Sequence, residues 1–111
     1  MSARVTRTTA VEAIRHVEDR GARVIIDVRS KIEFEEECIE GSCHIPLEEL
    51  VRRIDEILAI EGARLILCRS GKRAEFARQE LERLGVSDLL VVDGGILAYR
   101  LGGGETLRGD R

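Results

Sequence analysis

Continuous apolar runs alternate along this chain with segments in which apolar residues recur every three or four positions. The expected strands that contain these runs are Arg23–Val28, in which Asp27 interrupts the apolar residues, Leu65–Leu67 and Asp88–Val92. A strand that exposes one face alternates apolar and polar residues, so continuous runs are typical of strands buried on both faces of a parallel sheet. Shorter strands are expected at Val5–Thr6 and Cys43–Ile45.

The segments with helical spacing lie between these runs. Thr9, with Glu12 three residues later, fits a capping box that starts the first helix. Gly85 follows the third helix and suits a left-handed residue at its end. Glu33–Glu37 is expected to form an acidic turn. Four helices are expected, and they cover Thr9–Arg20, Pro46–Leu58, Ala74–Leu84 and Ile96–Leu101.

This alternation predicts an α/β fold with three layers, in which helices cover both faces of a central, mostly parallel sheet of about five strands. The 111 residues suffice for one hydrophobic core. We expect one domain over residues 1–104, ending at the glycines before Glu105, and a loosely ordered C-terminal tail over residues 105–111.

Composition and charge narrow the possible partners. The net charge is −3, and one Tyr, two Phe and no Trp are too few aromatic residues for a base-stacking surface, so no nucleic acid is expected. No apolar run has the length of a membrane span, and the first residues lack the apolar core of a signal peptide. We therefore predict a cytoplasmic protein that has no membrane partner.

No cofactor or metal is expected. The chain contains no Gly-x-Gly-x-x-Gly or Walker pattern, so a nucleotide is not indicated. Cys38, Cys43 and Cys68 match neither a zinc spacing nor a Cys-x-x-Cys pair.

Cys68 lies where a predicted strand ends and a helix begins. Ligands of open α/β sheets bind at this edge, and the free N–H groups and dipole of a helix start favour an anion. The cationic residues Arg69, Lys72 and Arg73 follow within five positions, and Gly71 permits a tight loop. Together these features favour a thiolate. The alternative is a buried, inert cysteine beside a solvated basic turn.

Asp27 ends its strand as Cys68 ends a later one. Carboxyl ends of parallel strands meet at one edge, so Asp27, Cys68 and Asp93 are expected around one shallow pocket. Arg29 is expected to pair with a carboxylate such as Glu33, and the acidic cluster is otherwise expected to face solvent.

These motifs make the sequence resemble a single-domain rhodanese, a family of sulfurtransferases. The matching segments span about Asp27 to Gly104 and include a specific Cys-x-x-Gly-x-Arg loop. Two positions depart from the family pattern, because Glu37-Cys38 replaces a Gly-His pair and Tyr99 replaces a Trp. The segments are Ile26-Asp27-Val28-Arg29, Glu33-Phe34, Ile39-x-Gly41-Ser42-x-His44-Ile45-Pro46, Cys68-Arg69-Ser70-Gly71-Lys72-Arg73 and Asp93-Gly94-Gly95-x-x-Ala98-Tyr99.

The resemblance implies that Cys68 takes sulfur from a small anionic donor such as thiosulfate or a persulfide. The Cys68 persulfide would pass it to cyanide, a thiol or a sulfur-relay protein. The N–H groups from Arg69 to Arg73, which include that of Ser70, would cradle the sulfur as an anion nest. Arg73 and Lys72 would hold the donor's sulfonate, with Arg69 guiding anions in.

Asp27 is expected to fix the active loop through hydrogen bonds or a pair with an arginine.

Two other functions stay open as alternatives. One is a non-catalytic rhodanese module. Dual-specificity phosphatases and arsenate reductases of similar fold have one more residue in the loop, whereas four residues separate Cys68 from Arg73 here. Cys38 is expected to be half-buried and chemically silent rather than a resolving thiol that attacks the Cys68 persulfide.

Overall fold

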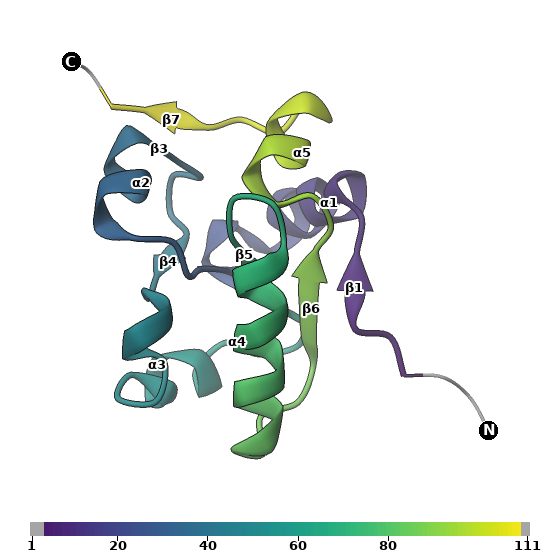
Figure 1. Ribbon diagram of the computed structural model, residues 1–111. Coiled ribbons are helices and arrows are strands. Elements are labelled where there is room, and N and C mark those ends of the chain that lie inside the picture. Colours follow the sequence, from purple (N-terminus) through teal and green to yellow (C-terminus); the bar gives the residue numbers. More distant parts are fainter. Residues whose placement is uncertain (1–3, 110–111) are drawn as a thin grey trace.

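The computed structural model describes residues 4–109 and shows a five-stranded sheet between helices (Figure 1). The sheet order is β1-β6-β5-β2-β4, and each neighbouring pair is parallel. The predicted fold class is therefore confirmed. The strands of this sheet are β1 (Arg7–Thr8), β2 (Ile25–Asp27), β4 (Cys43–His44), β5 (Arg64–Leu67) and β6 (Leu89–Val92).

Helices cover both faces of the sheet. In Figure 1, α4 passes in front of β5, whereas α1 lies behind the sheet and contacts α5. The helices are α1 (Ala10–Arg20), α2 (Lys31–Glu36), α3 (Ile54–Leu58), α4 (Lys72–Arg83) and α5 (Gly95–Leu101), with short 3₁₀ helices η1 (Ala22–Val24) and η2 (Leu47–Glu49).

The central strands carry the core, as the continuous apolar runs predicted. Ile25, Ile26, Leu65, Ile66 and Leu67 are fully buried. Polar residues at such positions would lose hydration on both faces of the sheet, which explains why these strands do not alternate.

Local signals set the ends of two helices as expected. Thr9 and Glu12 form the predicted capping box of α1, each side chain accepting from the other residue's backbone N–H. Gly85 follows α4 with φ of +92°, a left-handed conformation that costs glycine little.

Three local expectations are wrong in detail. The first strand is Arg7–Thr8 rather than Val5–Thr6. The acidic segment is helical, because Ser30 caps α2 in a second capping box. The helix expected from Pro46 to Leu58 is split into η2 and α3.

The buried face of this segment also differs from the expected one. Leu50 and Ile57 are buried, whereas Val51 and Leu58, which the expected helix placed on its apolar face, are at least half exposed. Nothing in the burial pattern explains why the segment is divided into two short helices.

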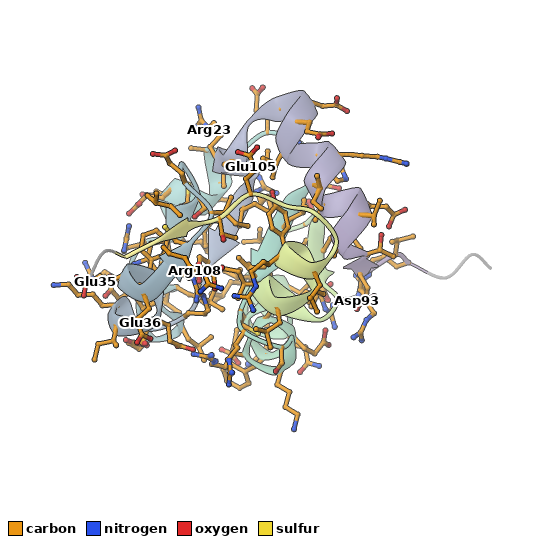
Figure 2. The ribbon with its side chains drawn as sticks, turned by 90° about the horizontal axis from the view of Figure 1, so that it is seen from above. Arg23, Glu35, Glu36, Asp93, Glu105 and Arg108 are labelled. Carbon is orange, nitrogen blue, oxygen red and sulfur yellow. The ribbon has the colours of Figure 1, made fainter. Side chains whose placement is uncertain are left out.

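The C-terminal segment is also more ordered than expected. Strand β7 (Leu107–Arg108) pairs antiparallel with β3 (Glu37–Cys38), so the tail crosses the top of the domain in Figures 1 and 2. Gly109 N donates to Glu36 O at 2.9 Å, which extends this pairing. Residues 105–109 are therefore attached to the domain, while 110–111 lie outside the described residues.

Candidate functional site around Cys68

Cys68 lies directly after β5, and α4 begins four residues later, as the sequence predicted. Its Sγ accepts a hydrogen bond from Gly71 N at 2.9 Å and a longer one from Ala74 N at 3.4 Å. Cys68 is only 1% exposed. The loop therefore directs two backbone N–H groups at the sulfur, an arrangement that stabilises negative charge on it.

Two glycines make this close approach possible. Gly71 has φ of +120°, which side-chain-bearing residues rarely adopt. Gly95, at the start of α5, lies so close to the loop that a Cβ there would be 2.3 Å from Arg69 O and 2.4 Å from Cys68 O. Ile96 N donates to Cys68 O at 2.9 Å. The start of α5 thus packs directly against the loop, a role that sequence reasoning did not assign.

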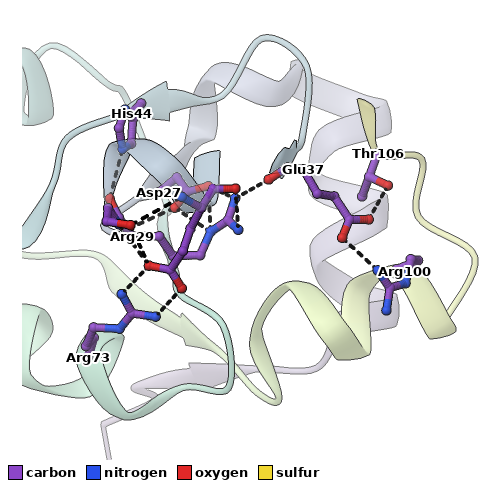
Figure 3. Close-up of polar contacts among 9 residues, drawn as sticks. Asp27, Arg29, Glu37, His44, Arg73, Arg100 and Thr106 are labelled. Atoms are coloured by element: carbon purple, nitrogen blue, oxygen red, sulfur yellow. Dashed lines mark hydrogen bonds and ion pairs between the residues drawn. The ribbon is translucent and has the colours of Figure 1, made fainter. Parts of the chain in front are cut away.

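Asp27 and Arg29 form a buried ion pair at the end of β2 (Figure 3). Asp27 is fully buried, and its carboxylate accepts from Arg29 Nη2 at 2.8 Å, Nε at 3.0 Å and the backbone N at 3.0 Å. The expectation that Asp27 pairs with an arginine is confirmed. Arg29 pairs with a carboxylate as expected, but that carboxylate is Asp27 rather than Glu33, of which Arg29 contacts the backbone oxygen.

Arg29 also joins two elements to the sheet edge. Its Nη2 donates to Glu37 O at 2.6 Å, and its own carbonyl accepts from His44 Nε2 at 2.8 Å. The His44 ring stacks on Phe34 with centroids 4.2 Å apart. A guanidinium that binds one carboxylate and two carbonyls has most of its N–H groups paired, which is the usual condition for burying it.

Arg73 is engaged by Glu33, which the sequence analysis did not foresee. Arg73 Nη1 and Nη2 donate to Glu33 Oε1 and Oε2 at 2.6 and 2.8 Å (Figure 3). These hydrogen bonds lower the pKa of Glu33 to about 2 against the opposing effect of burial, and they raise the pKa of Arg73. The expected role of Arg73 as a free sulfonate ligand therefore conflicts with its geometry. The Ser30–Glu33 capping spacing was the available sequence signal for a fixed Glu33.

The other cationic residues of the loop remain open to solvent. Arg69 and Lys72 are exposed, as is Ser70, and neither cation forms an ion pair with any residue from 4 to 109. Beside Arg69 is a hollow of about 210 Å³ between α2 and α5. Its wall contains Glu33, Glu36 and Glu37 as well as Arg29, Arg69 and Arg100, so side chains of both charges line this hollow.

Glu37 connects this wall to the C-terminal segment. Its carboxylate accepts from Arg100 Nη1 and from Thr106 Oγ1, both at 2.6 Å (Figure 3), and lies 3.8 Å from Arg108 Nε. Burial raises the pKa of Glu37, but Thr106, Arg100 and Arg108 together lower it more. The pKa of this carboxyl is therefore below its usual value. The residue therefore fixes α5 and the C-terminal segment to β3, a function that its place in an acidic cluster did not reveal.

Asp93 does not join the site. Its carboxylate accepts from Arg7 Nε at 2.6 Å, which ties β6 to β1 at the sheet edge. The expectation that Asp27, Cys68 and Asp93 surround one pocket is therefore wrong for Asp93. The exposed side chain of Arg7, on the neighbouring strand β1, binds the Asp93 carboxylate away from Cys68.

Cys38 and Cys43 lie outside the loop, and both are free thiols. Cys38 is 9% exposed, more buried than expected, and pairs in register with Leu107 of β7. Burial, with a smaller effect of Asp27, raises the pKa of the Cys38 thiol. Burial likewise raises the pKa of Cys43. Neither setting favours a thiolate.

Comparison with known families identifies the domain. A family model described as the Rhodanese-like domain matches residues 9–101. The chain belongs to this family. A crystal structure of a rhodanese-related protein from Thermoplasma volcanium is similar to this rhodanese-like domain, with a TM-score of 0.76 and 26% identity over 92% of this chain and 97% of that one.

Two curated relatives extend the comparison. The uncharacterized protein slr1261 of Synechocystis is 29% identical over 91% of this chain and 56% of its own length. The putative sulfur carrier protein YrkF of Bacillus subtilis is 35% identical over 61% of this chain and 36% of its own length. The rhodanese-like domain thus spans about half of the first relative and about a third of the second, and the matches point to sulfur transfer in general.

Between residues 4 and 109, no helix has the length and apolar character that crossing a bilayer requires.

Proposed function

We propose that this rhodanese-like domain transfers sulfane sulfur through a persulfide on Cys68. The observation that supports this most directly is the pair of backbone N–H groups, from Gly71 and Ala74, that donate to Cys68 Sγ. A neutral, structural thiol needs no such donors, whereas a thiolate and the terminal sulfur of a persulfide are both stabilised by them.

The proposed reaction has two half-reactions. The Cys68 thiolate attacks the outer sulfur of the donor, the donor's sulfur–sulfur bond breaks, and its electron pair leaves with sulfite or a thiolate. A thiol or cyanide acceptor then attacks the outer sulfur of the persulfide and releases the Cys68 thiolate. Because Cys68 is 1% exposed, attack on a terminal sulfur atom is favoured over attack on a bulkier centre.

The side chains around the loop then divide into two groups. Arg69 and Lys72 are the cations that meet an anionic donor, since neither forms an ion pair with another described residue. Asp27 and Arg29 act through the loop by holding the end of β2, and Arg73 acts through its pair with Glu33. Ser70 and Gly71 contribute backbone, and the small size of Gly71 permits the curl.

Oxyanion chemistry fits this geometry less well. Four residues separate Cys68 from Arg73, and both terminal nitrogens of Arg73 are bound by Glu33. A phosphate or arsenate needs a wider ring of donors and a free guanidinium fork. The non-catalytic alternative predicts instead that Cys68 does not acquire sulfur from any donor.

Mass spectrometry of the intact protein tests the proposal. Incubation with thiosulfate or with glutathione persulfide should add one sulfur atom, mapped to the Cys68 peptide, and cyanide should remove it. Cys68→Ser should abolish this gain and lower sulfur transfer by several orders of magnitude, since a hydroxyl stays protonated at neutral pH. Cys43→Ser is the matched control and should retain it.

Two outcomes would refute the proposal. One is sulfur transfer by Cys68→Ser, and the other is no gain of sulfur by the parent protein from either donor. Hydrolysis of an aryl phosphate by the parent and not by Cys68→Ser would support the phosphatase alternative. The cytoplasmic location and the thiol, cyanide or relay-protein acceptor stay predictions from the sequence.

A further inference from the structure

The carboxylate of Glu33 is held from two sides. Arg73 Nη1 and Nη2 donate to its Oε1 and Oε2 at 2.6 and 2.8 Å (Figure 3). From the start of α2, the backbone N and the Oγ of Ser30 each donate to Oε1 at 3.0 Å. Hydrogen bonds from the starts of two helices therefore fix this carboxylate where both of its oxygens accept from Arg73.

The same pair limits what Arg73 offers to a sulfur donor. A guanidinium recognises an oxyanion such as a sulfonate through its planar fork of N–H groups. Both terminal nitrogens of this fork donate to Glu33, and the side chains of Arg73 and Glu33 are 37% and 26% exposed. A sulfonate that displaced Glu33 would leave a partly buried carboxylate without its partner, which costs free energy.

Arg73 is nevertheless within electrostatic range of the reacting sulfur. Hydrogen bonds to Glu33 are the main cause of its raised pKa, and the negative charge of Cys68 adds a smaller contribution. The next residue, Ala74, donates its backbone N–H to Cys68 Sγ at 3.4 Å. A donor whose outer sulfur reaches Cys68 therefore meets Arg73 as one half of a neutral pair rather than as a free cation.

Arg69 and Lys72 do not replace the occupied fork. Both side chains are exposed, and neither forms an ion pair with a residue from 4 to 109. Exposed cations attract anions in general, but salt screens them and a bound ligand has to order their long side chains. They favour any anionic donor and provide no fixed, paired hydrogen bonds to a sulfonate.

We propose that Glu33 determines donor specificity: it withholds the Arg73 fork, so that the domain takes sulfur from a persulfide in preference to thiosulfate. This inference rests on the proposed sulfur transfer through Cys68 and names its class of donor. Glu33 acts through Arg73 and touches neither the donor nor the sulfur, so it is a positioning residue.

The two donors differ in the charge that the site has to stabilise. With a persulfide R–S–SH, the Cys68 thiolate attacks the outer sulfur, the S–S bond breaks and its electron pair leaves with RS⁻. The donor's proton then passes to RS⁻, which gives RSH and the Cys68 persulfide anion. Thiosulfate is a dianion that expels SO₃²⁻ in the same attack, and both charges of this leaving group need a cationic partner.

The test compares thiosulfate with 2-hydroxyethyl persulfide, a donor whose tail has no charge. Mass spectrometry of the intact protein, after quenching at timed intervals, follows the formation of the Cys68 persulfide over a range of donor concentrations. Each rate constant is divided by that of the same donor with free N-acetylcysteine, which removes the difference in intrinsic reactivity. The parent protein should favour the persulfide about tenfold or more on this scale.

Glu33→Gln retains an acceptor for Ser30 and removes the charge that binds Arg73. The thiosulfate concentration at half-maximal rate should fall about tenfold, as expected for one new charge-assisted contact, while the persulfide rate stays within about twofold. A purely structural role of Glu33 predicts slower reaction with both donors instead. Adding Arg73→Ala to Glu33→Gln should abolish the gain with thiosulfate, because the gain requires the released fork.

Glu36→Gln is the matched control. Glu36 is an exposed carboxylate of the same helix that lines the same hollow beside Arg69, and its loss should change neither donor by more than about twofold. The inference is overturned if Glu36→Gln lowers the thiosulfate requirement as Glu33→Gln does, if Glu33→Gln slows both donors alike, or if the double variant keeps the gain.

The parent protein decides the question even if Glu33→Gln does not fold. Equal normalised rates with the two donors would overturn the preference for a persulfide while leaving sulfur transfer through Cys68 intact. Failure of both donors to load Cys68 would instead refute the proposed function itself, so the two failures are distinct.

Discussion

Replacing Glu33 with Gln tests how much the pair with Arg73 stabilises the domain. A glutamine at this position retains the shape and the capping-box acceptor toward Ser30, but it removes the charge that Arg73 binds. The substitution therefore isolates the ion pair from the helix cap.

The pKa of Glu33 gives the magnitude. A carboxyl whose pKa falls from 4.5 to about 2 on folding contributes at most about 3 kcal/mol at neutral pH. The side chains of Glu33 and Arg73 are 26% and 37% exposed, so solvent screens the pair. We expect Glu33→Gln to lower the free energy of unfolding by about 1–2 kcal/mol at pH 7.

The pH dependence provides a second check. Because the folded-state pKa lies below the unfolded value, the contribution is complete above about pH 4.5 and is lost as pH falls toward 2. The stability difference between parent and variant should therefore shrink to less than about half its neutral value at pH 3.

Urea unfolding at pH 7 and pH 3 measures both effects, with Glu36→Gln as the control. Glu36 is an exposed carboxylate of the same helix and has no ion pair within residues 4–109, so its loss should cost less than about 0.5 kcal/mol. Equal losses for the two variants, or a Glu33→Gln loss as large at pH 3 as at pH 7, would refute the reasoning.

Three further substitutions test other parts of the structure. Asp27→Asn should destabilise the domain by about 3–5 kcal/mol, measured by urea unfolding, because it leaves a buried guanidinium without its counter-charge; a loss below about 1 kcal/mol would contradict this. Gly95→Ala should fold, as measured by circular dichroism, but should lose most sulfur transfer, because the added Cβ would be 2.3 Å from Arg69 O in the loop. The control is Gly85→Ala, which has no atom within 4 Å of the added Cβ and should retain sulfur transfer. Cys38→Ser should retain sulfur transfer within a few-fold, and a Cys38–Cys68 disulfide in a peptide map after thiosulfate would contradict a silent Cys38.

The sequence predicted those features that depend on local pattern. The continuous run before Asp27 indicates burial on both faces, which a parallel sheet covered by helices on each side provides. The capping box at Thr9 and the left-handed Gly85 are likewise satisfied by neighbours within a few positions. The place of Cys68 between strand and helix followed from the same kind of signal.

Features that depend on which distant side chains meet were not predictable in this way. Arg73 was expected to face the donor, but Glu33 is 40 positions away and reaches it only because α2 packs beside the loop. From the sequence, Glu37 was expected to be a solvated residue of an acidic cluster. In the structure, the segment that leads into β7 places Thr106 within hydrogen-bond distance of its carboxylate. Periodicity carries no information on such pairings, because any of several carboxylates satisfies an arginine equally well.

The contact between Gly95 and the Cys68 loop also limits how this domain can evolve. Converting the loop to one that encircles a larger anion requires an inserted residue, and the inserted backbone needs room. That room is occupied by the start of α5, where even one methyl group would overlap Arg69 O and Cys68 O. A single insertion after Cys68 is therefore expected to be lost by selection unless the Gly94-Gly95 turn changes with it, so the two segments should diverge together or not at all.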